Sequence, residues 1–402
     1  MKNKYLGTVI CLYLSYLIHG MGVIILAQNM GYLLTQLHTD KAGIGYVISA
    51  MGIGRLIVLY ASGVLSDKFG RRPFIYTGLF VYCIFFGGIL ISPNVQVAFF
   101  LALLAGVANS LMDAGTYPAL MEAFPNTPGT ANILIKAFMS AGQFLLPIIM
   151  GVIIANDLYY GISFIIPIVS FILIGLVLSR LEFPSGTTAK QGKASVVLQD
   201  KFIAKPKMWL EGASLIAIGF TCTVTFLVIQ IWMPTYGEQV VGMTKADSLQ
   251  LISYYGMGSL ASVFMTSYLV KEKVRPVTVV FVYPIISFIS LLGVYYYPTP
   301  MVATVGSFII GFSAAGGVLQ LALTSMIEIF PGKKGTITGI IYTASSIAGF
   351  VAPFVAGIIA QTNVANIILF DAGITLIGVI LAVIVNIRYR KVINMEIKGV
   401  QV

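Results

Sequence analysis

Charged side chains are scarce in this sequence. Asp, Glu, Lys and Arg make up 9% of its 402 residues, where a soluble protein has roughly 25%. Hydrophobic residues make up 58%, and the mean hydropathy is +0.95. Because so little of the chain can face water, the composition excludes soluble enzymes and nucleic-acid-binding domains and indicates a polytopic membrane protein.

Cysteine and histidine are also rare. The three cysteines, Cys11, Cys83 and Cys222, lie in apolar runs without metal-ligand spacing, and there are two histidines. These numbers exclude a disulfide framework and a Cys- or His-rich metal centre. We therefore expect no metal and no cofactor. We expect no enzymatic activity either, because no Ser/His/Asp or paired-carboxylate constellation shares one membrane depth.

What the sequence does contain is long apolar runs, which predict an all-α membrane protein with twelve spans. The polar stretch 182–207, rich in Lys, Gly, Ser and Thr, divides the chain into two six-helix bundles at 1–181 and 208–402. The predicted spans lie at about 6–35, 42–66, 73–92, 95–123, 129–155, 159–181, 208–237, 246–270, 276–297, 299–328, 335–361 and 365–389.

Basic residues are distributed unevenly about these spans. The net charge is +10, and twenty of the 24 Lys and Arg residues fall on one side of the membrane. Lys41 and Lys245 fall on the other side, and Arg55 and Lys136 lie within spans. By the positive-inside rule, both termini are predicted to be cytoplasmic. The short loops are typical of a bacterial cytoplasmic membrane protein, and the charge needs no nucleic-acid partner.

The two halves repeat each other in sequence. Glu122-Ala-Phe-Pro125 matches Glu328-Ile-Phe-Pro331 at an offset of 206 residues. Six further positions match at this offset without a gap: Gly129, Thr130, Ser140, Phe144, Pro147 and Gly151 repeat as Gly335, Thr336, Ser346, Phe350, Pro353 and Gly357. Because each repeat has an even number of spans, the two bundles have the same orientation, as in transporters built from parallel repeats.

A glycine- and charge-rich loop follows the second predicted span. It reads Gly63-Val-Leu-Ser-Asp67-Lys-Phe-Gly70-Arg71-Arg72-Pro. Glycine allows close packing or a turn, Asp67 can cap a helix start, and the arginines can bind carboxylates and helix-end carbonyls. The alternative is an ordinary basic loop on the cytoplasmic side, although the full string is far more specific than its charges.

This string resembles the signature loop of the major facilitator superfamily, and the twelve spans, two halves and central linker resemble that family over essentially the whole chain. The resemblance implies a secondary transporter that works by alternating access. It also implies that Asp67, Arg71 and Arg72 form a conformational latch, with Glu122 as an acidic partner of the loop arginines. The corresponding second-half segment, 268–276, lacks the Gly and Asp pattern.

Three charges within spans are the sharpest functional signal, because each costs on the order of 3 kcal/mol at the bilayer centre. Arg55 is about 18 Å from the cytoplasmic end of its span, Asp113 about 13 Å and Lys136 about 10 Å. The similar depths of Asp113 and Lys136 predict an ion pair, either proton-coupled or permanent. Arg55 binds either a substrate anion or an internal acid.

Polar residues near these charges are candidates for binding a substrate. In the first half, Asn109, Asp113 and Thr116 form one helical stripe, and Asn132, Lys136, Ser140 and Gln143 form another. His19 either relays protons, binds a hydroxyl group or is a structural group. In the second half the candidates are Gln230, Trp232, Tyr236, Tyr254, Tyr255 and Gln320, some of which could instead be interface anchors. We assign no role to Asp371.

Two cations and one nearby acid favour a small, anionic, hydroxylated solute, carried by proton symport with Asp113 as the titrating group. The substrate-binding candidates are His19, Arg55, Asn109, Asn132, Lys136, Gln143, Gln230, Tyr236, Tyr255 and Gln320. Alternatives are a sugar/proton symporter, since Asp113-Ala-Gly and Asn132-x-Leu distantly resemble the fucose permease branch, and a drug/proton antiporter. A channel or sensor of the same fold is a further alternative. We expect a monomer in the lipid bilayer.

Overall fold

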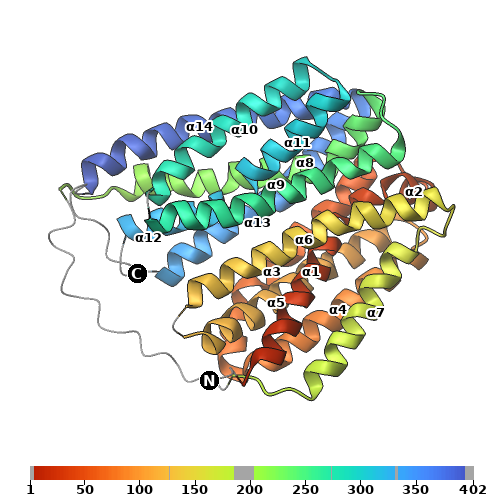
Figure 1. Cartoon of the computed structure of the whole chain (residues 1–402), viewed down its shortest axis with the longest axis horizontal. Helices are drawn as coiled ribbons and strands as arrows, with labels where there is room; N and C mark the ends of the chain where they lie inside the picture. Colours follow the sequence, from red (N-terminus) through yellow and green to blue (C-terminus); the bar gives the residue numbers. More distant parts are fainter. Residues whose placement is uncertain (1–3, 126, 185–202, 273, 331–333, 394–402) are drawn as a thin grey trace.

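The computed structural model describes residues 4–125, 127–184, 203–272, 274–330 and 334–393, and these segments are almost entirely helical. They form two bundles that lie side by side (Figure 1). The first bundle contains α1 (Leu6–Gln28), α2 (Met30–Gln36), α3 (Lys41–Phe69), α4 (Arg71–Ile91), α5 (Val95–Ala123), α6 (Pro128–Ala155) and α7 (Ile162–Ser179).

The second bundle begins after the predicted linker, of which residues 185–202 lie outside the described residues. It contains the short π-helix η1 (Met208–Gly212), α8 (Ala213–Gln239), α9 (Lys245–Glu272), α10 (Pro276–Tyr296), α11 (Pro300–Ala314), α12 (Val318–Ile329), α13 (Lys334–Thr362) and α14 (Ala365–Val392).

Most of the predicted spans are found as long apolar helices. Eleven helical segments in the described part of the chain are long and apolar enough to cross a membrane. A further long helix, α9, has 28 residues, is more polar, and packs along α6 and α11. We count it as the twelfth span by its length and position, and the predicted all-helical fold of two bundles is confirmed.

Two of the predicted spans are interrupted. The first breaks at Asn29, whose amide donates to the Ile25 carbonyl at 2.9 Å and to the Ser163 hydroxyl at 3.0 Å. A side chain that bonds nearby backbone competes with the regular helix. The tenth breaks between α11 and α12, where Gly317 has a φ of +107°. Only glycine adopts this left-handed conformation without steric strain.

The sequence repeat is visible in the backbone. α5 ends at Ala123 and α12 ends at Ile329, at equivalent repeat positions. The next residues, Phe124 and Phe330, have φ and ψ of −127° and 66°, and of −120° and 68°, respectively. The matching sequence segments therefore end equivalent helices with the same backbone conformation.

The bundles meet along two related helix crossings, α3 with α13 and α6 with α9, and α1 also packs beside α8. Small residues bring the backbones together at the first crossing. A Cβ atom at Gly45 would lie 2.5 Å from the Pro353 carbonyl oxygen, and one at Gly52 would lie 2.4 Å from the backbone of Gly349 and Phe350. The two bundles thus touch through bare backbone at this crossing.

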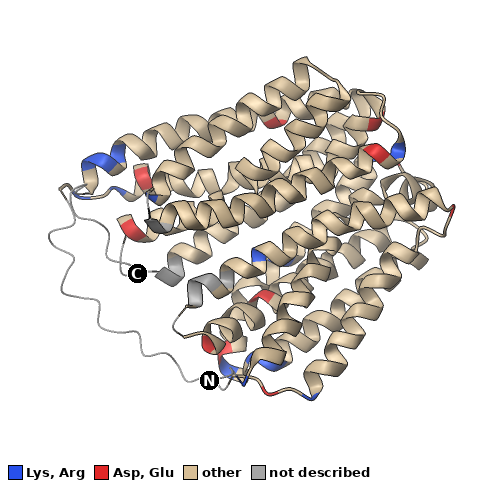
Figure 2. Ribbon diagram, in the orientation of Figure 1, with Lys and Arg blue, Asp and Glu red and all other residues tan. Residues whose placement is uncertain are grey.

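The two ends of the molecule differ in charge. Most of the Lys and Arg ribbon lies near the end where α1 begins and α14 ends, which we call the basic end (Figure 2). At the opposite end, hydrogen bonds join the bundles: Lys41 Nζ donates to Gln239 Oε1 at 2.5 Å, and Gln361 Nε2 donates to Asp40 Oδ2 at 2.5 Å. The α3–α13 crossing at Gly45 and Gly52 belongs to the same half of α3.

Candidate functional site

An ion pair between Arg55 of α3 and Asp113 of α5 lies at the centre of the site. The Arg55 Nη2 atom is 3.2 Å from Asp113 Oδ2, and the Tyr16 hydroxyl of α1 donates to Asp113 Oδ1 at 2.5 Å. The Arg55 and Asp113 side chains are 26% and 19% exposed. On the other side of Arg55, its guanidinium carbon is 5.8 Å from the centre of the Tyr342 ring of α13. The pair therefore lies between the bundles.

This arrangement corrects the predicted Asp113–Lys136 ion pair. Helices α3 and α5 pack with direct backbone contact, since a Cβ atom at Gly54 or at Gly106 would lie 2.0 Å from a carbonyl oxygen of the other helix. That approach brings Arg55 to Asp113. Lys136, which has a depth similar to that of Asp113, belongs to α6, which packs mainly on α1 and α9.

Lys136 instead faces the second bundle. Its Nζ atom lies 5.6 Å from the centre of the Phe226 ring of α8, and no carboxylate oxygen among the described residues lies within 4.0 Å of it. A cation over an aromatic face is stabilised without being neutralised. Lys136 thus provides a positive charge at the bundle interface that forms no ion pair within the described part of the chain.

His19 is held inside the first bundle by two polar neighbours. The Tyr82 hydroxyl lies 2.6 Å from His19 Nδ1, and Asn109 Nδ2 lies 3.3 Å from His19 Nε2. Because the amide nitrogen can only donate, Nε2 accepts and Nδ1 donates its proton to Tyr82. The imidazole is buried with both ring nitrogens bonded. This geometry agrees with the alternative that His19 is a structural group. The Asn109 amide lies against His19.

Several predicted polar residues are buried with unused hydrogen-bonding groups. Neither polar atom of the Gln143 amide has a partner among the described residues, and the same holds for the Thr116 hydroxyl. In the second bundle, Gln230 Nε2 donates to the Tyr255 hydroxyl at 3.2 Å, while Gln230 Oε1 and the Trp232 indole N–H lack partners. Buried polar groups without partners are uncommon and can mark sites for water or ligand.

The remaining candidates are placed differently. The Tyr236 hydroxyl donates to the Val294 carbonyl at 2.6 Å, which commits it to the core of the second bundle. Gln320 and Tyr254 are exposed on α12 and α9, and Ser140 bonds Ser259 across the bundle interface at 2.9 Å.

Asn132 lies on α6, but its side chain falls outside the part of the structure that is described.

At the basic end, the loop motif forms a compact ion-pair network. Arg71 Nη1 lies 2.5 Å from Asp67 Oδ1, and Arg71 Nε lies 3.3 Å from Glu122 Oε1. Arg72 donates to the Ser179 carbonyl at 3.1 Å, which ties the loop to α7. Arginine suits this position because its planar fork can bind two acceptors at once.

Two details of the motif differ from the expectation. Asp67 lies inside α3 and bonds Arg71, while the residue that precedes α4 is Gly70, with a φ of +90°. Asp67 therefore does not cap a helix start. A Cβ atom at Gly63 would meet nothing within 4 Å, so close packing does not require this glycine.

Sequence reasoning missed three aromatic neighbours of the charges: Tyr16, Phe226 and Tyr342. A signal existed for two of them. Tyr16 precedes His19 by one helical turn, so it shares the inward face of α1. Tyr342 lies 206 residues after Lys136, at the equivalent repeat position. Phe226 has no such signal, because its role depends on the contact between bundles.

The sequence matches a known family and known proteins over most of its length. The profile of the Major Facilitator Superfamily matches residues 12–353. The inner membrane transport protein YdiM of Escherichia coli is 44% identical, covering 97% of this chain and 96% of that protein. The uncharacterized MFS-type transporter YfkL of Bacillus subtilis is 43% identical, covering 98% and 100%.

A solved structure has the same fold. The crystal structure of a D-xylose-proton symporter superposes with a TM-score of 0.75 at 16% sequence identity, covering 94% of this chain and 97% of that one. This likeness concerns the fold alone, whereas the family match and the relatives above 40% identity extend over most of the chain. The chain therefore belongs to the Major Facilitator Superfamily and is an integral membrane transporter of the secondary-transporter kind.

Proposed function

We propose that this transporter moves a small, hydroxylated organic anion together with a proton. The observation that carries this proposal is the placement of two cations, Arg55 and Lys136, on the first bundle with their charged groups facing rings of the second. A carboxylate group placed between them would receive charge-assisted hydrogen bonds. One acid, Asp113, balances one of these two charges.

The geometry supports a simple coupling mechanism. Asp113 and a substrate carboxylate compete for the same guanidinium group of Arg55. When Asp113 takes up a proton, its hold on Arg55 weakens and the guanidinium can bind the substrate. The site then accepts one anion and one proton together, so its net charge is unchanged when both are bound. Symport requires this kind of link, in which the substrate binds only when an acid in the site is neutral.

The bundle contacts support an alternating-access cycle in which the bundles rock about this site. We propose that the basic end is cytoplasmic, as the positive-inside rule predicts, and that the state described here is closed at the outer end. Residues 1–181 and 208–402 would then be the two moving units, and residues 182–207 would connect them. A monomer contains the complete proposed site.

Transport in proteoliposomes tests the substrate class. The probes are labelled gluconate and glucose, which share a carbon skeleton and differ in charge, with ethidium as a cationic drug. We expect an inside-alkaline pH gradient to drive accumulation of the anion only. Accumulation of glucose alone would instead support the sugar/proton alternative, and proton-driven extrusion of ethidium would support the antiporter.

Lys136→Gln is expected to weaken binding of the anion. Loss of one charge-assisted hydrogen bond corresponds to about 1.5–3 kcal/mol, or roughly 10- to 150-fold in KM. Lys136→Arg, which keeps the charge, should retain most of the affinity. The measurement is the KM for uptake. Lys391→Gln, the same change at an exposed lysine in the last turn of α14, is the control, and an equal KM in both Gln variants would contradict the proposal.

We also propose that Arg71, Asp67 and Glu122 act as a latch between conformations. Lysine at position 71 can hold one of the two carboxylates but not both. Arg71→Lys is therefore expected to shift the balance of states by about 1 kcal/mol, or about fivefold in transport rate. Thermal stability should change little, because the pairs are partly exposed.

Arg72→Lys is the matched control for the latch. Arg72 binds a backbone carbonyl, which a lysine can also reach. Initial uptake rates and melting temperatures of the two variants would be compared. Identical rates in the two variants would exclude a special role for Arg71.

A further inference from the structure

Asp371 of α14 is a buried acid that the proposed transport site does not use. Its side chain has no exposed surface, and neither carboxyl oxygen has a hydrogen-bond partner among the described residues. It lies about 9 Å from the start of its helix, within the second bundle. Burying an ionised carboxylate without a donor or a cation is strongly unfavourable, so a neutral acid fits this environment better.

Hydroxyl groups lie directly beside this acid. Thr375 lies one turn after Asp371 on the same face of α14, and its hydroxyl donates to the backbone carbonyl of Asp371 at 2.8 Å. The same hydroxyl lies 2.7 Å from that of Thr225 on α8. The Thr225 hydroxyl also lies 3.0 Å from the Thr221 carbonyl, so the acid stands next to a short chain of hydroxyl and carbonyl groups.

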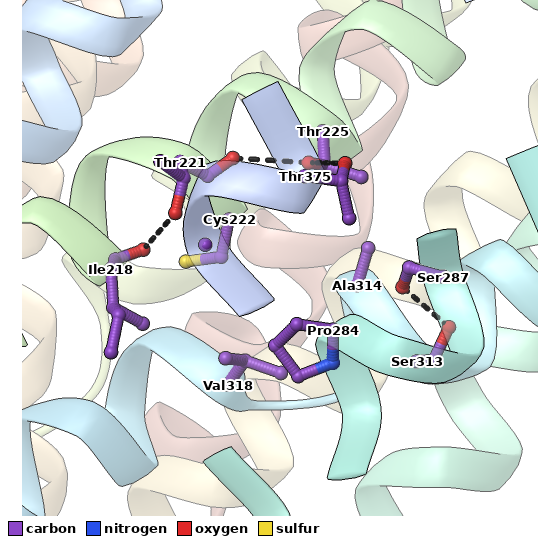
Figure 3. A pocket seen from close by; sticks show the side chains of 11 residues that line it. Ile218, Thr221, Cys222, Thr225, Pro284, Ser287, Ser313, Ala314, Val318 and Thr375 are labelled. Carbon is purple, nitrogen blue, oxygen red and sulfur yellow. Dashed lines mark hydrogen bonds between the residues drawn. The ribbon is translucent and has the colours of Figure 1, made fainter. Parts of the chain in front are cut away.

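A small cavity continues from these hydroxyls into the bundle (Figure 3). Its volume is about 20 Å³, which is enough for one water molecule. Figure 3 shows Thr225 and Thr375 on one side of it and the hydrogen-bonded pair Ser287 and Ser313 on the other. Each of these hydroxyls has a lone pair left to accept a bond from water.

The cavity also approaches the transport site. Cys222 lines it, and Cys222 is one helical turn before Phe226 on α8. Phe226 is the ring that faces Lys136 across the bundle interface. Cavity and interface are therefore separated by one turn of α8.

We propose that Asp371 is a second proton-binding site, protonated in this conformation, which exchanges its proton through water in the cavity lined by Thr225, Thr375, Ser287 and Ser313. On release, the carboxyl O–H bond breaks, the proton passes to water, and the carboxylate keeps the electron pair. The proposal is independent of the transported solute and of Asp113. A sodium ion fits less well, because the carboxyl oxygens are not part of a preformed shell of oxygen ligands.

Few other ionisable groups surround Asp371. The Tyr255 phenol of α9 is a titratable group close enough to interact with it. Helices α8, α10 and α13 and the short helix η1 pack against α14. Their charged residues, Glu211, Glu238 and Lys334, lie in η1 or at helix ends, and α10 has none. Glu211 pairs with Arg388 in the last part of α14, far along the helix from Asp371. With no ion-pair partner beside it among the described residues, Asp371 is free to remain neutral.

Infrared spectroscopy of the purified full-length protein tests this site without any solute. At neutral pH, we expect the absorption band of a protonated carboxylic acid, which shifts when the folded protein is transferred to D₂O. Asp371→Asn should lose the band and Asp113→Asn should keep it. Thr375→Val, which removes a neighbouring hydroxyl at nearly constant shape, should slow the isotope shift at least severalfold.

The possible results separate the alternatives. Absence of the band in the wild-type protein would show an ionised acid and overturn the proposal. So would a sodium-dependent rise in melting temperature that is lost in Asp371→Asn. A band that shifts only on unfolding would show a permanently sealed acid and would also contradict it. Because the wild-type band and its isotope shift are read directly, the test remains decisive if a variant fails to fold.

Discussion

Asp113→Asn is expected to abolish gradient-driven accumulation while leaving exchange of the anion intact. Asparagine cannot take up or release a proton, so the proton gradient loses its connection to the site. Arg55 remains charged and becomes a better partner for substrate, because the amide competes with a carboxylate less well than Asp113 does. The variant should therefore bind the anion at least as tightly as the wild type.

The size of this effect follows from the driving force. For one proton carried per anion, a gradient of one pH unit corresponds to 1.36 kcal/mol, or about tenfold accumulation. In the variant the inside and outside concentrations should become equal. Uptake under an imposed pH gradient measures accumulation of the anion. Equilibrium exchange of labelled anion between identical solutions on both sides measures whether the variant still carries the anion.

A matched substitution checks that the loss is specific. Asp247 is an exposed acid in the first turn of α9, where its carboxylate accepts a bond from the Thr244 hydroxyl at 2.7 Å. Asp247→Asn makes the same chemical change away from the bundle interface, and accumulation should persist. If Asp113→Asn still accumulated the anion tenfold, Asp113 would have no part in coupling. If equilibrium exchange were lost in Asp113→Asn together with accumulation, the pair with Arg55 would be needed for the structure of the site itself.

The fold could be read from the sequence because its determinants are local or repeated. Apolar runs define the spans, and the offset of 206 residues relates the two bundles. The breaks at Asn29 and Gly317 were missed for a physical reason. Both residues are compatible with a continuous apolar run, and their effect depends on partners such as Ser163 that are distant in sequence.

The site was harder to predict than the fold. Depth along a helix predicts that Arg55, Asp113 and Lys136 lie well inside their spans, but depth contains no information on which helices touch. The choice of Arg55 over Lys136 as the partner of Asp113 depends on Gly54 and Gly106, which bring α3 against α5. Such a glycine contact is recognisable only once both helices are in place.

Gly52→Ala is expected to stop transport without unfolding the protein. The added methyl group would lie 2.4 Å from the backbone of Gly349 and Phe350 on the other bundle, and backbone cannot move aside as a side chain can. The simplest relief is separation of α3 from α13, which prevents closure at the end opposite the basic end. An overpacking cost of about 1–3 kcal/mol would shift the balance of states roughly 5- to 150-fold.

Two further glycine substitutions make this prediction specific. Gly349→Ala lies on the partner helix of the same crossing, but its methyl group would be 3.5 Å from Gly52 Cα, an ordinary contact, so transport should be nearly normal. Gly54→Ala would place a methyl group 2.0 Å from the Leu103 carbonyl oxygen within the first bundle. That clash cannot be relieved by moving the bundles apart, so the melting temperature should fall.

Spin labels at Thr35 on α2 and Thr362 on α13, both exposed at the end opposite the basic end, would report the bundle separation directly. The wild type should show two distances between the labels, a short one when this end is closed and a longer one when it is open. In Gly52→Ala we expect the longer distance to dominate, with a melting temperature close to that of the wild type. In Gly349→Ala the wild-type distribution should remain. A Gly52→Ala protein that keeps both the short distance and full transport would show that α3 and α13 never need to approach this closely. Rocking of the bundles through this crossing would then be excluded as the route between states.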